Sequence, residues 1–200
     1  MLRRLLELVV VGVLLLVIAG SGWLMVGGPV QGAAQGPVTV DTATAAEHGF
    51  EDPRVETIQF REDVDVGGVE KAVDLTAYTM MTNNQETGAA VVTVSLPGWT
   101  VGGVSFNPLT YAPLKQAVTH VLPYLPMDIP EATWHGESTV ELADEEVTAG
   151  EYSVEGDGSR LVVARETMDG DTVFAVGLFS EERPEGREAV ESVFGELTHG

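Results

Sequence analysis

Four histidines are the side chains best suited to metal binding or acid–base chemistry, and their spacing forms no known motif. They are His48, His120, His135 and His199, which lie far apart along the chain. A helical zinc site would place two histidines one turn apart, with a glutamate directly after the first. A site assembled from distant positions stays open, but the spacing favours histidines on the surface. We therefore expect no metal-binding residue.

A second stretch, from Gly103 to Asn107, comes within one residue of the nucleophile elbow of serine hydrolases. That motif, G-x-S-x-G, requires glycine at the position of Asn107. No neighbouring residue supplies a base or an oxyanion site. Ser105 or Asn107 can instead accept hydrogen bonds from free backbone amides ahead of a helix. We interpret the stretch as a turn and a helix cap, and we predict no catalytic residue.

Stretches rich in glycine and aspartate also fall short of ligand-binding motifs. Glu155–Ser159 and Asp169–Thr172 resemble parts of a calcium loop, but neither continues to the glutamate that closes such a loop. Their position between predicted strands favours hairpin turns. The glycine pairs at Gly67 and Gly102 lack the spacing of a dinucleotide fingerprint, so we expect no cofactor. Aromatic residues that could line a ligand cleft, but that more often belong to the core of a small domain, are Trp99, Trp134, Tyr78, Tyr111 and Tyr124.

The composition excludes several further classes of function. The chain has 200 residues and no cysteine, so it holds no disulfide, thiolate zinc site, iron–sulfur cluster or cysteine nucleophile. Its 31 acidic and 10 basic residues give a formal net charge of −21, which leaves no electrostatic basis for binding a phosphate backbone. Nucleic acid is therefore not an expected partner. The length and a hydrophobic content of 44% fit one folded domain with an appendage.

The acidic residues are spread along the chain rather than gathered in a tail. From Asp41 onward the chain carries 30 acidic and eight basic residues. At molar salt the Debye length falls to about 3 Å, and the mutual repulsion of such a surface is largely screened. We interpret the composition as adaptation to a hypersaline medium. The alternative is a charged surface dedicated to a cationic partner, which should cluster its charges.

The first 28 residues predict a transmembrane anchor or an export signal. Leu8–Val26 is an apolar run of 19 residues behind Arg3 and Arg4, and as a helix it would be about 28 Å long, enough to cross a bilayer. The arginines predict a cytoplasmic N-terminus and an extracellular C-terminal domain, with a single pass through the cell membrane over residues 5–28. Small residues before Gln35 leave signal cleavage open, although the length of the run favours retention. Residues 29–47 are expected to form a flexible tether.

Beyond the tether the hydrophobic pattern predicts one extracytoplasmic domain, residues 48–200, of the α+β class. Strands over 55–66 and 69–82 are expected to form a hairpin through Gly67 and Gly68, and a central strand follows over 89–96. The three- and four-residue spacing of apolar side chains predicts helices over 109–122 and 184–197. Antiparallel strands are expected between these helices, over 133–140, 147–155, 160–167 and 172–179. The predicted fold is an N-terminal transmembrane helix followed by a mainly antiparallel sheet with two packed helices.

The order of these elements resembles an uncharacterised family of exported proteins in haloarchaea, many of them lipoproteins. The residues that carry the resemblance are Gly49 with Phe50, the "VDVGG" turn, Ser105–Pro108 and "VFAVGLF" at Val173–Phe179, within roughly residues 48–197. The resemblance implies export but no activity, cofactor or site residue. Ser21 stands where the lipidated cysteine of the lipoprotein members would be, so retention would rest on the apolar helix itself. The element order is more distantly similar to the Mog1/PsbP-like α-β-α sandwich, an analogy of fold alone.

Two functions from different classes stay open. The first is a membrane-anchored extracytoplasmic binding or interaction module of a halophilic archaeon, without catalytic activity and with a protein or small ligand as its partner. The second is a hydrolase or lyase that uses a carboxylate pair as acid and base. A deep pocket with two carboxylates, one of them with a perturbed pKa, would favour the enzyme, and a shallow surface would favour the binding module. The lack of a recognisable catalytic motif favours the first function.

We predict that chloride salts steeply raise the midpoint of thermal unfolding of the domain. The 30 acidic groups from Asp41 to Gly200 repel one another in the folded state, and unfolding separates them, so weaker screening favours the unfolded ensemble. Thermal unfolding followed by circular dichroism in increasing potassium chloride measures this effect. Chloride is preferable to sulfate, because sulfate also strengthens hydrophobic burial. A midpoint that stays constant from dilute to molar chloride would contradict the hypersaline interpretation.

Overall fold

Strands dominate the structure, a computed structural model that describes residues 30–66, 69–101, 104–122, 125, 129, 131–156 and 158–200. These residues form twelve strands and four helices, the longest helix having 12 residues. The expected α+β class with an N-terminal transmembrane helix and two packed helices is therefore wrong, since the fold is mostly β-sheet with short helices. No helix in the described part of the chain is long and apolar enough to cross a membrane. Residues 1–28, where the transmembrane helix was expected, lie outside the described residues.

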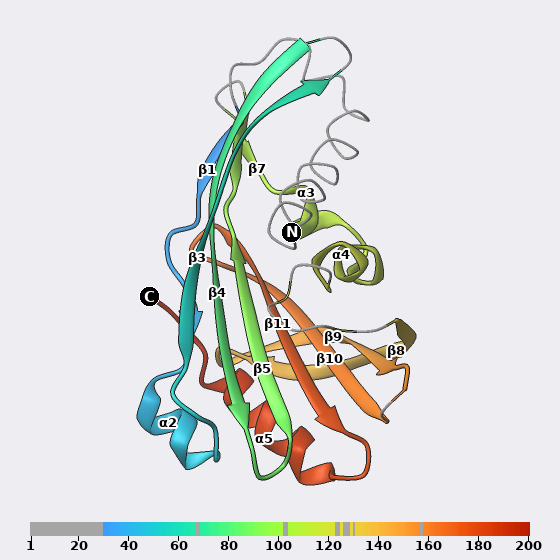
Figure 1. The fold of residues 1–200 in the computed structure, drawn as a ribbon. Coiled ribbons are helices and arrows are strands. Elements are labelled where there is room, and N and C mark those ends of the chain that lie inside the picture. The colour runs from blue at the N-terminus through green and yellow to red at the C-terminus, as the bar shows by residue number, and fades with distance from the viewer. Residues whose placement is uncertain are drawn as a thin grey trace.

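Most strands belong to one large, mainly antiparallel sheet (Figure 1). Its main part consists, in sheet order, of β3 (Arg54–Val66), β4 (Val69–Asn84), β5 (Ala89–Leu96), β11 (Asp171–Ser180), β10 (Ser159–Met168), β9 (Glu145–Val154) and β8 (Ala132–Leu142). β4 is long enough to have two neighbours on one edge. Tyr78–Asn84 of β4 pair with β5, and Val73–Thr76 pair in parallel with β1 (Val30–Ala33). A hairpin of β6 (Trp99–Val101) and β7 (Val104–Phe106) continues the sheet beyond β1.

The sheet is buried on both faces, and each face has its own hydrophobic core. One core lies under α5 (Pro184–Gly195) and under a segment that contains β2 (Val38–Thr39) and α2 (Thr42–Glu47). The other lies under α3 (Pro108–Tyr111) and α4 (Leu114–Val121). Successive side chains of a strand point to opposite faces, so β11 contributes to both cores. Val173 and Ala175 enter the first, while Phe174 and Val176 enter the second.

Most of the predicted strands are present, and the helices differ in their bounds. β3 pairs with β4 in continuous antiparallel register, and β5 lies between β4 and β11, as the pattern predicted. The predicted helix over 109–122 is instead divided into α3 and α4 at Pro113, whose ring cannot continue a helix from the preceding residue. The helix predicted over 184–197 ends at Gly195.

The segment expected to be a tether, residues 29–47, forms regular structure from Val30 onward. Besides β1, it contains β2, which pairs with β12 (Thr198–His199), and α2, which begins after Asp41. The Asp41 carboxylate accepts hydrogen bonds from the backbone amides of Ala43 and Thr44 at 2.9 and 3.1 Å. Hydrogen bonds to Thr44 also lower the pKa of Asp41. A local pattern could not indicate β1 or β2, because their partner strands lie far away in the sequence.

Gly177 in the middle of β11 sets the distance between the sheet and α5. A Cβ atom at this position would lie 2.2 Å from Val190 Cγ1 and 3.0 Å from Val162 Cγ1. Both neighbours are fully buried in the first core, so neither has free space into which to move. α5 can therefore pack at its observed distance only because residue 177 has no side chain.

We predict that Gly177→Ala destabilises the domain by about 1–3 kcal/mol, the usual cost of overpacking a core. Urea unfolding in molar chloride, with wild type and variant compared at the same salt concentration, measures the difference. Gly195→Ala in α5 is the matched control, because its added methyl group would meet atoms no closer than 3.8 Å. Equal stability of Gly177→Ala and wild type would show that α5 is free to shift.

Candidate functional site

The structure places the four histidines, the side chains best suited to metal binding or acid–base chemistry, at separate positions. His48 ends α2, His120 lies in α4, and His135 in β8 has its Nε2 atom 2.8 Å from Ser153 Oγ. His199 lies in β12, and its side chain is only 8% exposed, so the interpretation as a surface histidine is wrong for this residue. In the described ranges, no group of three or more histidine, aspartate or glutamate side chains is arranged to hold a metal ion.

Asn107 caps a helix, as the sequence predicted, but Val104–Phe106 before it form strand β7 rather than a turn. The buried Asn107 side chain accepts a hydrogen bond from the Leu109 amide at 3.0 Å and donates one to the Pro97 carbonyl at 3.0 Å. It therefore joins the start of α3 to the turn after β5. Asp169 and Gly170, with positive φ angles of 50° and 90°, form the hairpin turn between β10 and β11.

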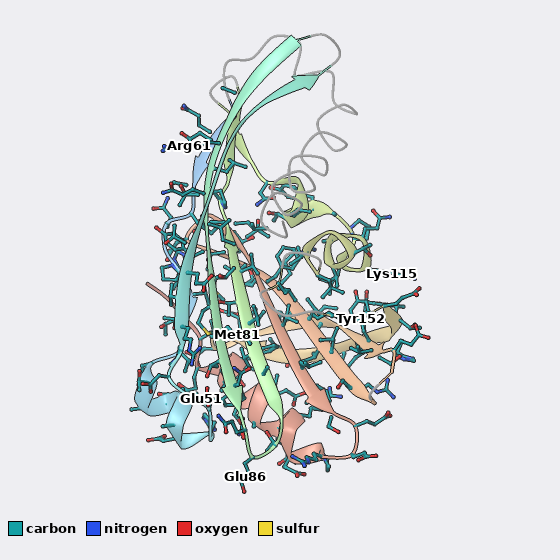
Figure 2. All side chains as sticks on the ribbon, viewed as in Figure 1. Glu51, Arg61, Met81, Glu86, Lys115 and Tyr152 are labelled. Carbon is teal, nitrogen blue, oxygen red and sulfur yellow. The ribbon has the colours of Figure 1, made fainter. Side chains whose placement is uncertain are left out.

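Two of the candidate aromatic residues pack together in the second core. The rings of Trp134 and Tyr152 meet edge to face, with centroids 5.1 Å apart, and the Lys115 ammonium lies 6.0 Å from the Trp134 ring centroid. Figure 2 shows Lys115 and Tyr152 on the same side of the sheet. Burial raises the pKa of Tyr152 to about 12, and its hydroxyl has no hydrogen-bond partner among the described residues. Tyr111 is different, since 82% of it is exposed at the end of α3.

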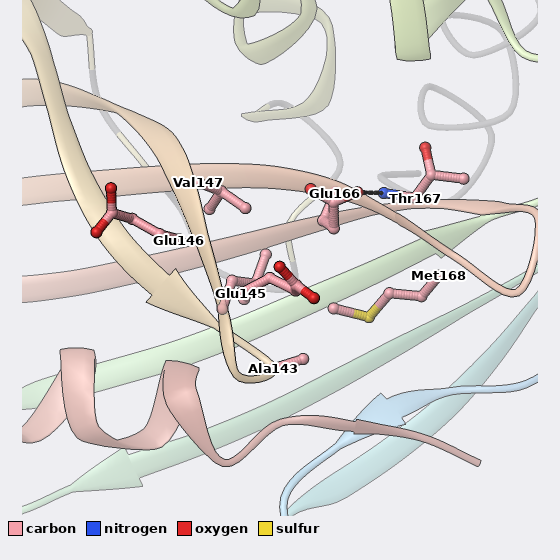
Figure 3. A pocket seen from close by; sticks show the side chains of 8 residues that line it. Ala143, Glu145, Glu146, Val147, Glu166, Thr167 and Met168 are labelled. Carbon is pink, nitrogen blue, oxygen red and sulfur yellow. Dashed lines mark hydrogen bonds between the residues drawn. The ribbon is translucent and has the colours of Figure 1, made fainter.

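Two open hollows flank the turn between β8 and β9, and acidic side chains line both. The smaller, of about 300 Å³, is lined by Leu142, Ala143, Glu145, Glu146, Val147, Glu166, Thr167 and Met168. Figure 3 shows Glu145 and Met168 pointing toward each other across it. The larger, of about 660 Å³, is lined by Thr139, Val140, Glu141, Asp144, Glu146, Glu188, Glu191 and Ser192. We call this larger hollow the acidic groove, because five of its lining residues carry a carboxylate and none is basic.

The turn at one end of the acidic groove is fixed by hydrogen bonds to α5. Ala143 and Asp144 have positive φ angles of 51° and 65°, a conformation that costs roughly 1–2 kcal/mol for a residue with a side chain. Their backbone amides donate to the carbonyl oxygens of Phe194 and Gly195 at 2.9 and 3.2 Å. These carbonyls end α5 and would otherwise lack intrahelical partners. The turn therefore caps α5 and holds β8 and β9 at a set distance from it.

A single arginine neutralises part of the charge beside the groove. Arg187 Nε donates to Glu191 Oε1, and Arg187 Nη2 donates to Glu151 Oε1, both at 2.7 Å. Burial opposes the charge of Arg187, but the hydrogen bonds and charges of Glu191 and Glu151 outweigh it and raise the pKa of the guanidinium group. Within the described part of the chain, the other four groove carboxylates have no ion pair.

A second cluster, which sequence reasoning missed, joins His199 to two aspartates. His199 Nδ1 lies 2.9 Å from Asp169 Oδ2, and His199 Nε2 lies 3.2 Å from Asp171 Oδ2. The ring nitrogens face in opposite directions, so these carboxylates do not converge on one point as metal ligands would. Burial raises the pKa of Asp171, although hydrogen bonds from Gln35 and the contact with His199 oppose the shift. The sequence Asp169-Gly170-Asp171 could have indicated this cluster, but we interpreted it only as a turn.

The fold and the two clusters define a mostly β, acid-rich domain with one sheet covered on both faces. The chain belongs to a family of domains of unknown function, DUF6517, whose sequence pattern matches residues 37–198. The match begins inside the expected tether, in agreement with the regular structure found there. The expected relation to an uncharacterised family is thus confirmed at this level. A comparison with curated proteins found no match.

Proposed function

We propose that this chain is a binding module for a cationic partner, with the acidic groove as its binding surface. The observation that carries the proposal is the convergence of five carboxylates, from the β8–β9 hairpin and α5, on one groove without a basic lining residue. Arginine and lysine side chains of a partner would form charge-assisted hydrogen bonds with these carboxylates.

The open form of the groove supports binding of a partner surface more than catalysis. Acid catalysis by a carboxyl group needs a raised pKa, which burial away from water usually provides. Asp171 is a carboxyl group whose pKa is raised by burial, and it lines neither of the two hollows. The groove carboxylates Glu141, Asp144, Glu146 and Glu188 are exposed, as suits recognition of a charged partner from solution.

The groove proposal predicts that an oligo-arginine peptide binds the protein and that groove substitutions weaken its binding. The triple variant Glu141→Gln/Glu146→Gln/Glu188→Gln should lose roughly tenfold in affinity, since three surface charges contributing about 0.5 kcal/mol each give this factor. Fluorescence anisotropy of a labelled peptide measures the affinity, at the lowest chloride concentration that keeps the protein folded.

The matched control changes the same number of charges away from the groove. Glu47, Glu56 and Glu182 are exposed, line neither hollow and form no ion pair among the described residues. The control variant Glu47→Gln/Glu56→Gln/Glu182→Gln should lose much less affinity than the groove variant. Equal losses in both variants would show that the peptide responds to net charge alone and would overturn the assignment of the groove.

We further propose that the domain acts outside the cytoplasm in a saline medium. Arg3 and Arg4 followed by an apolar run support export, and acidic residues spread over the chain support a high-salt environment. Protease added to intact cells that produce the chain should digest a C-terminal epitope tag, while a cytoplasmic control protein stays intact. Digestion of the tag only after cell lysis would contradict export.

A further inference from the structure

His199 connects the C-terminal strand to two other parts of the domain. β12 pairs with β2, and the Gly200 amide donates to the Pro37 carbonyl at 3.1 Å. From the same strand the His199 ring reaches the carboxylates of Asp169, in the β10–β11 turn, and Asp171, at the start of β11. Asp171 in turn accepts the Gln35 amide at 2.6 Å. Three segments far apart in the sequence therefore meet at this histidine and its aspartates.

Both ring nitrogens of His199 face a carboxylate oxygen, and two ionised carboxylates require two N–H donors. A neutral imidazole has one N–H group and one lone pair, whereas an imidazolium has two N–H groups. A neutral ring would point its lone pair at one of the two carboxylates, and that contact would be repulsive. The observed geometry therefore fits the protonated ring.

The contact between His199 and Asp171 is shielded from water, so solvent screens it little, whereas the contact with Asp169 lies at the surface. The side chains of His199 and Asp171 are 8% and 2% exposed, while that of Asp169 is 75% exposed. The groups that face the ring are Asp169 from the turn and Asp171 from β11, and the Gln35-Gly36-Pro37 segment has no titratable side chain. Loss of the ring proton would leave the buried Asp171 charge without its cationic partner, which is costly.

We propose that His199 is a latch controlled by its own protonation. As an imidazolium it holds β12 and residues 35–39 against the β10–β11 turn, and on losing its proton it releases them. The two contacts stabilise the fold only while the ring carries both protons, so their stabilisation is lost when rising pH removes one of them. Release of β2 would also uncover Val38, which is 1% exposed and belongs to the first core. The latch lies away from the acidic groove and does not depend on the proposed partner.

Hydrogen exchange of the full-length chain as a function of pH tests this latch. Histidine side chains commonly lose their proton between about pH 5 and 8. We expect that raising the pH across this general range lowers the protection of amides in residues 35–39 and 198–200 roughly tenfold, after correction for intrinsic exchange rates. Amides of β10 and β11 beyond the turn should keep their protection. Constant protection of residues 198–200 over the whole range would overturn the proposal.

Three variants separate the latch from general effects of pH. His199→Gln has no imidazole to protonate. It should abolish the pH dependence of amide protection in residues 35–39 and 198–200. Asp169→Asn removes the exposed partner of the ring, leaves the core untouched and should reduce the size of the change. His135→Gln is the matched control, since the ring of His135 contacts Ser153 and no carboxylate, and it should behave like wild type. The same pH dependence in His199→Gln as in wild type would overturn the latch.

Nitrogen NMR of histidine-labelled protein gives an independent readout, because the Nδ1 and Nε2 shifts distinguish imidazolium from neutral imidazole. The His199 signal, assigned through its bonds to the backbone of the wild-type chain, should change over the same pH range as the protection of residues 198–200. Titration of the ring without a change in that protection would overturn the proposal, even if His199→Gln failed to fold.

Discussion

The burial of β11 on both faces is the constraint on which the rest of the structure depends. A central strand with apolar side chains on both sides needs a cover on each side, and the chain supplies α5 on one face and α3 with α4 on the other. α5 can approach closely because Gly177 has no side chain. Once α5 is docked, its last carbonyls accept hydrogen bonds from the β8–β9 turn. The acidic groove is thus a consequence of how closely α5 packs on β11.

The few basic residues of this acid-rich domain are used as connectors between elements. Arg165 donates to the carbonyls of Leu109 and Ala112 at 2.6 and 2.7 Å, which holds the end of α3 on β10, although burial lowers the pKa of its guanidinium group. Arg183 donates to the Glu86 carbonyl at 2.7 Å, and Arg187 joins α5 to β9. Exposed ion pairs contribute little on their own. Bonds to backbone carbonyls matter more here, because they satisfy acceptors at the end of the short helix α3 and in the turn between β4 and β5.

Local patterns in the sequence predicted the elements whose partners are near in sequence, and missed those whose partners are far. The alternating pattern over β3 and β4, the apolar run of β5 and the turn residues Asp169 and Gly170 indicated strands and a hairpin turn that the structure contains. β1, β2 and β12 have two to four residues each and gain their structure only from distant strands, so no periodicity marks them. The same limit applies to the candidate sites. Glu141 and Glu188 line one groove, and His199 contacts Asp171, only after the sheet has formed.

Among its described residues the domain has exposed carboxylates and one buried carboxylate, and the two kinds respond to different solution conditions. The exposed carboxylates of the acidic groove and of the remaining surface interact through water, so added salt screens them. Asp171 is buried, and its charge is balanced by the His199 ring and the Gln35 amide, which bulk ions cannot replace. Salt should therefore govern the stability of the whole domain. The protonation of one histidine should govern only the contact between residues 35–39 and 198–200. This separation of a global from a local response follows from the burial of one carboxylate among many exposed ones.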